Sequence, residues 1–153
     1  MPLIVYYQHF ISKMILNKHF YRIDDYSKLV VSGENKREIA LIVLQEDYNK
    51  HQELLEKIMG SVKLDMAKDL GLGLIAEADK RIQIQDYPNL ASSKHLFLFG
   101  LGAETLSLQF NLKAYHPVRT EMYILHPLDS LKDLSSDVNK KKILWGYLKK
   151  VFK

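Results

Sequence analysis

The run YILHPLDSLKDLSSDVNKKKILWGYLKKVF, residues 123–152, decides how the rest of the chain is interpreted. It opens with an apolar stretch typical of a buried strand and leads directly into His126-Pro127. Because proline lacks the backbone N–H that a strand ladder needs, we expect the strand to end there. Three leucines at a spacing of three follow, and this spacing predicts a helical turn lying on a sheet.

The same run predicts a terminal helix that is capped by Ser135, Ser136 or Asp137. Its periodicity places five side chains on one inward-facing stripe: Val138, Lys141, Trp145, Leu148 and Phe152. Trp145 is the only tryptophan of the chain, and a lone tryptophan at helical spacing usually packs in the core. We therefore expect Trp145 to be buried against the sheet.

Upstream of this run, apolar segments alternate with helical patterns. Four segments are predicted as largely parallel central strands, at residues 39–44, 70–75, 95–99 and 120–125. A further β-rich segment at 28–31 is expected to form a hairpin with the first of them. Helices on both faces would make a three-layer α/β/α fold with a mainly parallel central sheet of about four strands.

Length and composition indicate one globular domain. The chain has 153 residues, a net charge of +4 and 47% hydrophobic residues, which is ordinary for a folded domain without disulfides. It has no cysteine, which excludes thiol catalysis, iron–sulfur clusters and cysteine zinc sites. The six histidines show no paired ligand spacing, so we expect neither a metal nor a cofactor.

The first segment, residues 1–27, is expected to be an arm outside the α/β domain of residues 28–153. Its beginning lacks a basic leader and a small-residue cleavage site, so we expect no signal peptide, no membrane span and a cytoplasmic location. The arm either packs on its own domain or binds a partner. The partner-binding candidates form one helical stripe: Tyr6, Tyr7, Phe10, Ile11 and Met14.

Functional loops of such sheets gather at the carboxyl ends of the parallel strands. Here those ends carry six candidate pocket residues: Gln45, Glu46, Tyr48, Gly100, Gly102 and His126. Two plainer roles stand beside this interpretation. Glu46 and Asp47 suit the positive end of a helix dipole, and a histidine before proline often only hydrogen-bonds backbone.

Basic residues dominate the end of the chain. No acidic residue follows Asp137, and Lys140, Lys141 and Lys142 open the terminal helix. This triplet either forms a solvated helix face or contacts phosphate groups of a nucleic acid. Direct DNA binding, or binding through partners, is therefore open.

Three segments together resemble the uracil-DNA glycosylase superfamily: IVLQEDY, LFLFGLGAETL and ILHPLDSL, with KKKILWGYLKKV as the terminal helix. The resemblance spans roughly residues 38–152 and implies the glycosylase-like fold. Under it, Glu46 would orient water or stabilise the sugar cation, and His126 would donate to the leaving base. The chain lacks the proline of the first motif, and LDSLKD brings two acids where a small apolar DNA-inserting loop is expected.

A related resemblance fits these departures better. The segments VLQEDYNKHQELLEKIMGSV, KHLFLFGL and HPLDSLKDLSSDVNKKKILWGYLKK resemble the psi-subunit family of the bacterial DNA polymerase III holoenzyme. That family shares the architecture, is not enzymatic and joins the clamp loader to the chi subunit. We therefore expect a non-catalytic replication accessory protein with clamp-loader or chi-like partners and no catalytic residues. A glycosylase, active or degenerate, is the alternative, with Glu46 and His126 as its catalytic pair.

Overall fold

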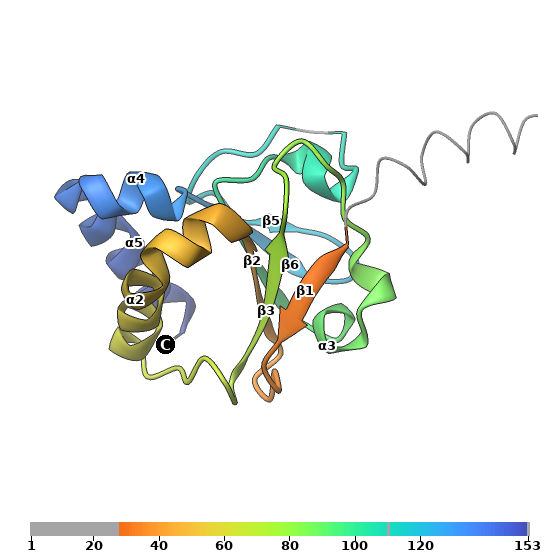
Figure 1. Ribbon diagram of the computed structural model, residues 1–153, viewed down its shortest axis with the longest axis horizontal. Helices are drawn as coiled ribbons and strands as arrows, with labels where there is room; N and C mark the ends of the chain where they lie inside the picture. Colours follow the sequence, from red (N-terminus) through yellow and green to blue (C-terminus); the bar gives the residue numbers. More distant parts are fainter. Residues whose placement is uncertain (1–27, 110, 153) are drawn as a thin grey trace, which may run out of the picture.

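The computed structural model describes residues 28–109 and 111–152. This part of the chain forms a mixed α/β fold with a six-stranded sheet and four α-helices (Figure 1). The elements are β1 (Leu29–Ser32), β2 (Ile39–Leu44), α2 (Gln45–Ser61), β3 (Leu70–Ile75), 3-10 turn η1 (Ile84–Asp86), α3 (Pro88–Ala91), β4 (His95–Phe99), 3-10 turn η2 (Ala103–Leu106), β5 (Val118–Arg119), β6 (Ile124–Leu128), α4 (Leu131–Ser136) and α5 (Val138–Val151).

The strand order is β1-β3-β2-β4-β6-β5. The four inner strands pair in parallel, whereas β1 and β5 pair antiparallel at the two edges. The expected mainly parallel sheet is thus corrected to a mixed one. The inner strands are continuously apolar because helices and loops cover both faces, and their positions agree with three of the four predicted strands.

The predicted hairpin at the start of the domain is wrong. β1 pairs with β3, with Leu29 opposite Ile75, and makes no ladder with β2. The turn between β1 and β2 instead bonds the segment before β3, for example Glu34 N–H to the carbonyl of Ala67 at 2.8 Å. Gly33, at φ +90°, approaches the carbonyl of Leu70 so closely that no Cβ fits. The turn therefore passes over the amino end of β3, and this places β1 on the outer edge of the sheet.

The last strand is shifted from its predicted position and runs through the proline. β6 covers Ile124–Leu128, so His126-Pro127 lies inside the strand and does not end it. Ile124 N–H and the carbonyl of Leu128 bond toward β4, and the alternation turns Pro127 toward the other side. On that side β5 does not extend as far as Pro127, and the Pro127 carbonyl instead accepts a hydrogen bond from Tyr115 N–H at 2.8 Å. Proline is tolerated at this position because no neighbouring strand needs its missing N–H.

Two clusters of buried side chains lie on opposite faces of the sheet. On one face α2, α4 and α5 pack over Leu41, Phe97 and their neighbours; on the other, α3, η1 and η2 cover Ile42 and Leu98. Figure 1 shows the three longer helices gathered on one side and α3 on the other. On the α3 side, Gly73 leaves room for neighbouring side chains, since a Cβ there would lie 2.9 Å from Ile42 Cδ1.

Helix α2 begins as soon as β2 ends and bends within its length. Its N-cap is Leu44, which makes no side-chain cap hydrogen bond, and the acidic residues Glu46 and Asp47 lie in its first turn. His51 has non-helical dihedral angles, φ −128° and ψ 27°, and divides the helix into two parts. The first part lies at the carboxyl end of β2, and Figure 1 shows the second running in another direction beside α5. Because of the kink, the first part of α2 lies at the strand ends and the second part packs on the core.

Helix α5 is capped by Asp137, one of the three predicted caps, whose carboxylate accepts from Asn139 and Lys140 N–H. Its buried stripe holds Leu144 and Leu148, with Tyr147, Val151 and Phe152 partly buried. Trp145 is 46% exposed, which overturns its predicted place in the core. The buried stripe lies farther around the helix than predicted, because Leu144 and Tyr147 face the sheet and Trp145 does not.

The segment after Gly102 forms only the 3-10 turn η2, which ends at Ser107 with a left-handed φ of 60°. Residues 1–27, with the five partner-binding candidates of the arm, lie outside the described residues. Within the described part of the chain, no helix has the length and apolar character needed to cross a membrane.

Candidate functional site

A solvent-open pocket lies where the parallel strands end. The strand order reverses between β2 and β4, and ligands of open α/β sheets bind outside the carboxyl ends at such a point. The cavity measures about 610 Å³. Its lining comes from the start of α2, from the turn after β4 and from α4: Leu44, Glu46, Asp47, Lys50, His51, Gly100, Ser130, Lys132, Ser135 and Ser136.

The floor of this pocket depends on Gly100. Its φ is +72°, and a Cβ would lie 2.5 Å from Ser130 Cβ and 2.9 Å from Ser130 Cα. The turn after β4 therefore lies directly against the N-cap of α4, whose Ser130 hydroxyl accepts from Asp133 N–H at 3.1 Å. Glycine is required here by both the backbone angle and the close approach, so its role is structural.

Two charged groups of the pocket, Glu46 and Lys50, pair with each other. Glu46 forms an ion pair with Lys50 at 3.0 Å, one helical turn along α2. The hydrogen bond and the charge of Lys50 lower the pKa of Glu46, so the carboxylate is ionised and already engaged. The Glu46 side chain is 69% exposed. A general base for chemistry near pH 7 usually has a raised pKa, and Glu46 is shifted the other way.

His126 lies in a different place, in the middle of β6 under α5. It is 3% exposed, and both of its ring nitrogens have partners. Nε2 lies 3.0 Å from Nδ1 of His95 on β4, and Nδ1 lies 2.6 Å from the hydroxyl of Tyr147 on α5. A neutral His126 carries a proton on only one ring nitrogen, so it donates one of these two hydrogen bonds and accepts the other.

Aromatic rings enclose this histidine. The Phe97 ring stacks on it at 4.3 Å between centroids, and His95 stacks at 5.2 Å. Burial, followed by the neighbouring His95, lowers the pKa of His126 to about 4, and burial also lowers the pKa of His95. Burial raises the pKa of Tyr147 to about 12. All three groups are therefore neutral at pH 7, and the buried His126 carries no uncompensated charge.

The structure brings together only part of the predicted site. Glu46 and Gly100 line the carboxyl-edge pocket, but His126 does not. Gln45 is the first residue of α2 and does not line it, and Tyr48 packs on the core beneath α2. A Cβ on Gly102 would contact the Glu104 carboxylate, so this glycine faces its own loop. Only two of the six predicted residues, Glu46 and Gly100, therefore line the pocket.

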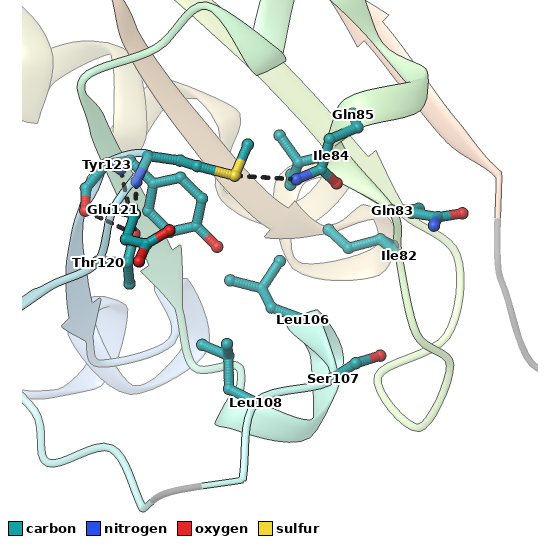
Figure 2. Close-up of a pocket in the computed structure, with 11 residues that line it drawn as sticks. Ile82, Gln83, Ile84, Gln85, Leu106, Ser107, Leu108, Thr120, Glu121 and Tyr123 are labelled. Carbon is teal, nitrogen blue, oxygen red and sulfur yellow. Dashed lines mark hydrogen bonds between the residues drawn. The ribbon is translucent and has the colours of Figure 1, made fainter.

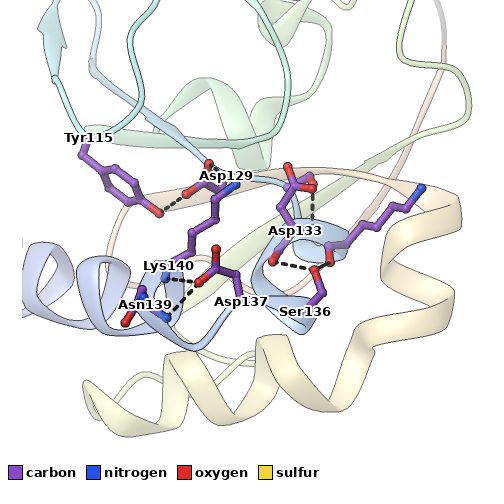
Figure 3. A network of polar contacts seen from close by, with 9 residues as sticks. Tyr115, Asp129, Asp133, Ser136, Asp137, Asn139 and Lys140 are labelled. Carbon is purple, nitrogen blue, oxygen red and sulfur yellow. Dashed lines mark hydrogen bonds and ion pairs between the residues drawn. The ribbon is translucent and has the colours of Figure 1, made fainter.

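The three predicted phosphate contacts also separate. Lys140 lies 3.9 Å from the Asp129 carboxylate, which additionally accepts a 2.6 Å hydrogen bond from the Tyr115 hydroxyl (Figure 3). Burial and this carboxylate raise the pKa of Tyr115 well above its usual value. Lys141 faces a shallow cavity of about 750 Å³ over the α2 residues Glu53 and Glu56.

Lys142 differs from its two neighbours, because it is exposed and forms no ion pair within the described residues. Of the predicted triplet, Lys142 is exposed, whereas Lys140 and Lys141 are partly buried.

A second cavity of about 400 Å³ lies at the amino end of β6 (Figure 2). Its walls are mixed: the apolar residues are Ile82, Ile84, Leu106, Leu108, Met122 and Tyr123, and the polar ones are Gln83, Gln85, Ser107, Thr120 and Glu121. Figure 2 shows the Tyr123 ring directed into this space. This cavity could not be predicted from the sequence, because its walls come from three segments far apart in the chain.

Sequence reasoning also missed the His95–His126–Tyr147 chain and the pocket residues Lys50 and Lys132. The alternation in KHLFLF and YILHPL places each histidine on a strand face, but only the strand register brings the two rings together. Among the described residues, no group of three or more His, Asp or Glu side chains is placed to hold a metal ion.

Comparison with known proteins adds no relative. No protein-family model matches the chain, and no curated protein matches it.

Proposed function

We propose that this chain is a non-catalytic accessory protein of DNA replication, similar to the psi subunit of the DNA polymerase III clamp-loader complex. The observation that carries the non-catalytic part is the position of His126. It is 3% exposed, and His95 and Tyr147 hold both ring nitrogens. The psi-like part depends on the resemblance of the segments around the first strand, the KHLFLFGL strand and the terminal helix.

Base excision needs a donor and a carboxylate in one open site. Glu46 lines the pocket at the strand ends, whereas His126 lies inside β6 under α5. For His126 to meet a flipped base, α5 would have to leave the sheet together with Leu144 and Leu148, which are both fully buried. This arrangement favours a structural role for His126 over a catalytic one.

The three-layer glycosylase-like architecture belongs to the same proposal. Four parallel inner strands and two buried clusters on opposite faces support it. A cytoplasmic location, with clamp-loader or chi-like subunits as partners, follows from the psi-like role.

Co-purification tests the proposed partners. The full chain, tagged at its C-terminus, is mixed with the clamp-loader proteins and the chi-like subunit of the organism that encodes it. We expect a stable complex, and we expect the variant lacking residues 1–27 to lose the clamp loader. The absence of any complex with the full chain would contradict the psi-like role.

A base-excision assay tests the non-catalytic part separately. The full chain is incubated with single-stranded and duplex DNA that contain uracil, with an authentic uracil-DNA glycosylase as the positive control. We expect no abasic product above the level of a heat-inactivated sample. Excision that disappears in Glu46→Gln would reject the proposal and establish the glycosylase alternative.

A further inference from the structure

The outer face of α5 combines exposed apolar groups with unpaired cations. Trp145, Val138 and Ile143 are 46%, 64% and 53% exposed, and they are three of the five large exposed apolar side chains of the described residues. Lys142, Lys149 and Lys150 lie among them and are exposed. We call these six residues the α5 outer face.

The charge of this face is of one sign. The helix sequence VNKKKILWGYLKKV contains no acidic residue. Within the described part of the chain, none of the three outer lysines forms an ion pair. Lys149 and Lys150 also suit the negative end of the helix dipole, but Lys142, near its middle, does not. A polyanion is the complementary partner.

Four of these side chains are arranged in a line. Val138, Lys142, Trp145 and Lys149 follow one another at spacings of four, three and four residues, which places them in one row along the helix. A Cβ on Gly146 would have no atom of another element within 4 Å, so no other element covers this side of the helix. None of the three cavities described above is lined by Trp145, Val138 or Ile143.

The indole is already placed for stacking. Lys149 Nζ lies 3.6 Å from its ring centroid, and this cation–π contact orients the ring and brings a positive charge beside it. Protein partners usually anchor large side chains in pockets, and none of the three cavities described above lies on this face. Single-stranded nucleic acid instead offers planar bases for an exposed aromatic ring and phosphates for nearby lysines.

We propose that the α5 outer face binds single-stranded nucleic acid, with Trp145 stacking on a base and Lys142, Lys149 and Lys150 contacting phosphates. This deepens the proposed replication role, because it gives an accessory protein direct contact with unpaired DNA. It does not depend on the clamp-loader partners, since the surface lies wholly within the described domain.

Trp145 is the only tryptophan in the chain and so reports on its own site. The full chain is titrated with an oligothymidylate, and we expect the tryptophan fluorescence to be quenched on binding. With three phosphate contacts, the affinity should fall roughly 20-fold between about 50 and 200 mM salt. Duplex DNA of the same length should bind more weakly, because its bases cannot stack on the indole.

Anisotropy of a labelled oligothymidylate tests the variants. Trp145→Ala should weaken binding roughly tenfold or more, with little change in the salt dependence. Lys142→Gln, Lys149→Gln and Lys150→Gln combined should abolish most binding and most of the salt dependence. The matched control removes the same charge from exposed lysines elsewhere, with Lys36→Gln, Lys68→Gln and Lys113→Gln, and should bind nearly as tightly as the natural chain.

Three results would overturn the proposal. Equal loss of affinity in both triple variants would show that only net charge matters. Unchanged affinity in Trp145→Ala, with circular dichroism confirming that the variant is folded, would remove stacking. Fluorescence quenching by polyglutamate but not by oligothymidylate would assign the face to an acidic protein. A chain that binds oligothymidylate yet fails to join clamp-loader proteins would retain this site while losing the psi-like role.

Discussion

The pocket at the carboxyl ends of β2 and β4 is open to solvent, whereas the histidine pair between the sheet and α5 is closed over by aromatic rings. Each region holds one of the two residues expected to cooperate in base excision. Glu46 is largely exposed and paired with Lys50, while His126 is 3% exposed and held by His95 and Tyr147. Chemistry requires both groups in one place, and the fold separates them.

The two regions differ in how much their polar contacts contribute to the stability of the fold. An ion pair in water contributes little to stability, because solvent screens it and the side chains remain mobile. A buried polar chain contributes more, because each lost partner leaves a donor or acceptor without a hydrogen bond away from water. Changes in the closed region should therefore lower stability, whereas changes to the exposed ion pair of the open pocket should leave it nearly unchanged.

The largest expected effect follows removal of the buried imidazole. His126→Ala should lower the free energy of unfolding by about 2–5 kcal/mol, because it leaves a cavity beside Phe97 and strips partners from His95 and Tyr147. Chemical denaturation monitored by circular dichroism measures the change. Glu46→Ala is the control from the open pocket, and its denaturation midpoint should stay at that of the natural chain. Equal stability in the two variants would break the comparison.

Acid should weaken the closed region next. The pKa of His126 is about 4 in the folded chain and near 6.5 when unfolded, so between these values the unfolded state binds more protons. Stability is therefore complete above pH 6.5 and falls by about 3 kcal/mol as the pH decreases to 4. His95, beside Lys94, acts in the same direction.

Urea unfolding at a series of pH values measures this slope. In His126→Phe, which keeps an aromatic ring against Phe97 but cannot titrate, the slope should be markedly smaller. A profile that is the same with and without the imidazole would assign the acid sensitivity to another group.

A smaller effect distinguishes two tyrosines. Tyr147→Phe removes the hydroxyl that lies 2.6 Å from His126 Nδ1, and it should destabilise the fold by about 1 kcal/mol. Tyr123→Phe is the matched control, since its hydroxyl makes no hydrogen bond within the described residues. Thermal unfolding of the two variants side by side shows the contrast. The comparison fails where both changes have the same effect.

The smallest effect concerns Gly60, in the last turn of α2. A Cβ there would have no atom within 4 Å, so Gly60→Ala should stabilise the chain by about 0.5–1 kcal/mol through better helix propensity. Gly100→Ala provides the opposite case, because its backbone angle and Ser130 leave no room. Differential scanning calorimetry should show one transition shifted up and the other down.

The sequence predicted the inner strands well because their signal is local. Continuous apolar runs at 39–44, 70–75 and 95–99 identify buried parallel strands without reference to their neighbours. The position of β1 could not be predicted, since its pairing with β3 depends on the path of the turn at Gly33, which the local sequence does not determine. The place of Pro127 depended equally on what lies beside it, namely the early end of β5.

The site was harder to predict than the fold. The carboxyl-edge pocket followed from topology, and Glu46 and Gly100 do line it. His126 was placed at the strand end because proline suggested termination, whereas the register sets it opposite Phe97 in mid-strand. Trp145 was assigned to the core from spacing alone, but spacing cannot decide which of two apolar stripes of one helix faces the sheet.

A titration of the histidine rings by NMR tests the central claim most directly, namely that His126 holds the fold and performs no chemistry. Ring nitrogens of the full chain, labelled at histidine, are followed from about pH 8 downward, with His126→Phe used for assignment. A His126 ring that stays neutral until near pH 4, in one tautomer throughout, is the predicted result. A ring that titrates near 6.5, with protons in rapid exchange with water, would show an accessible imidazole and contradict the account.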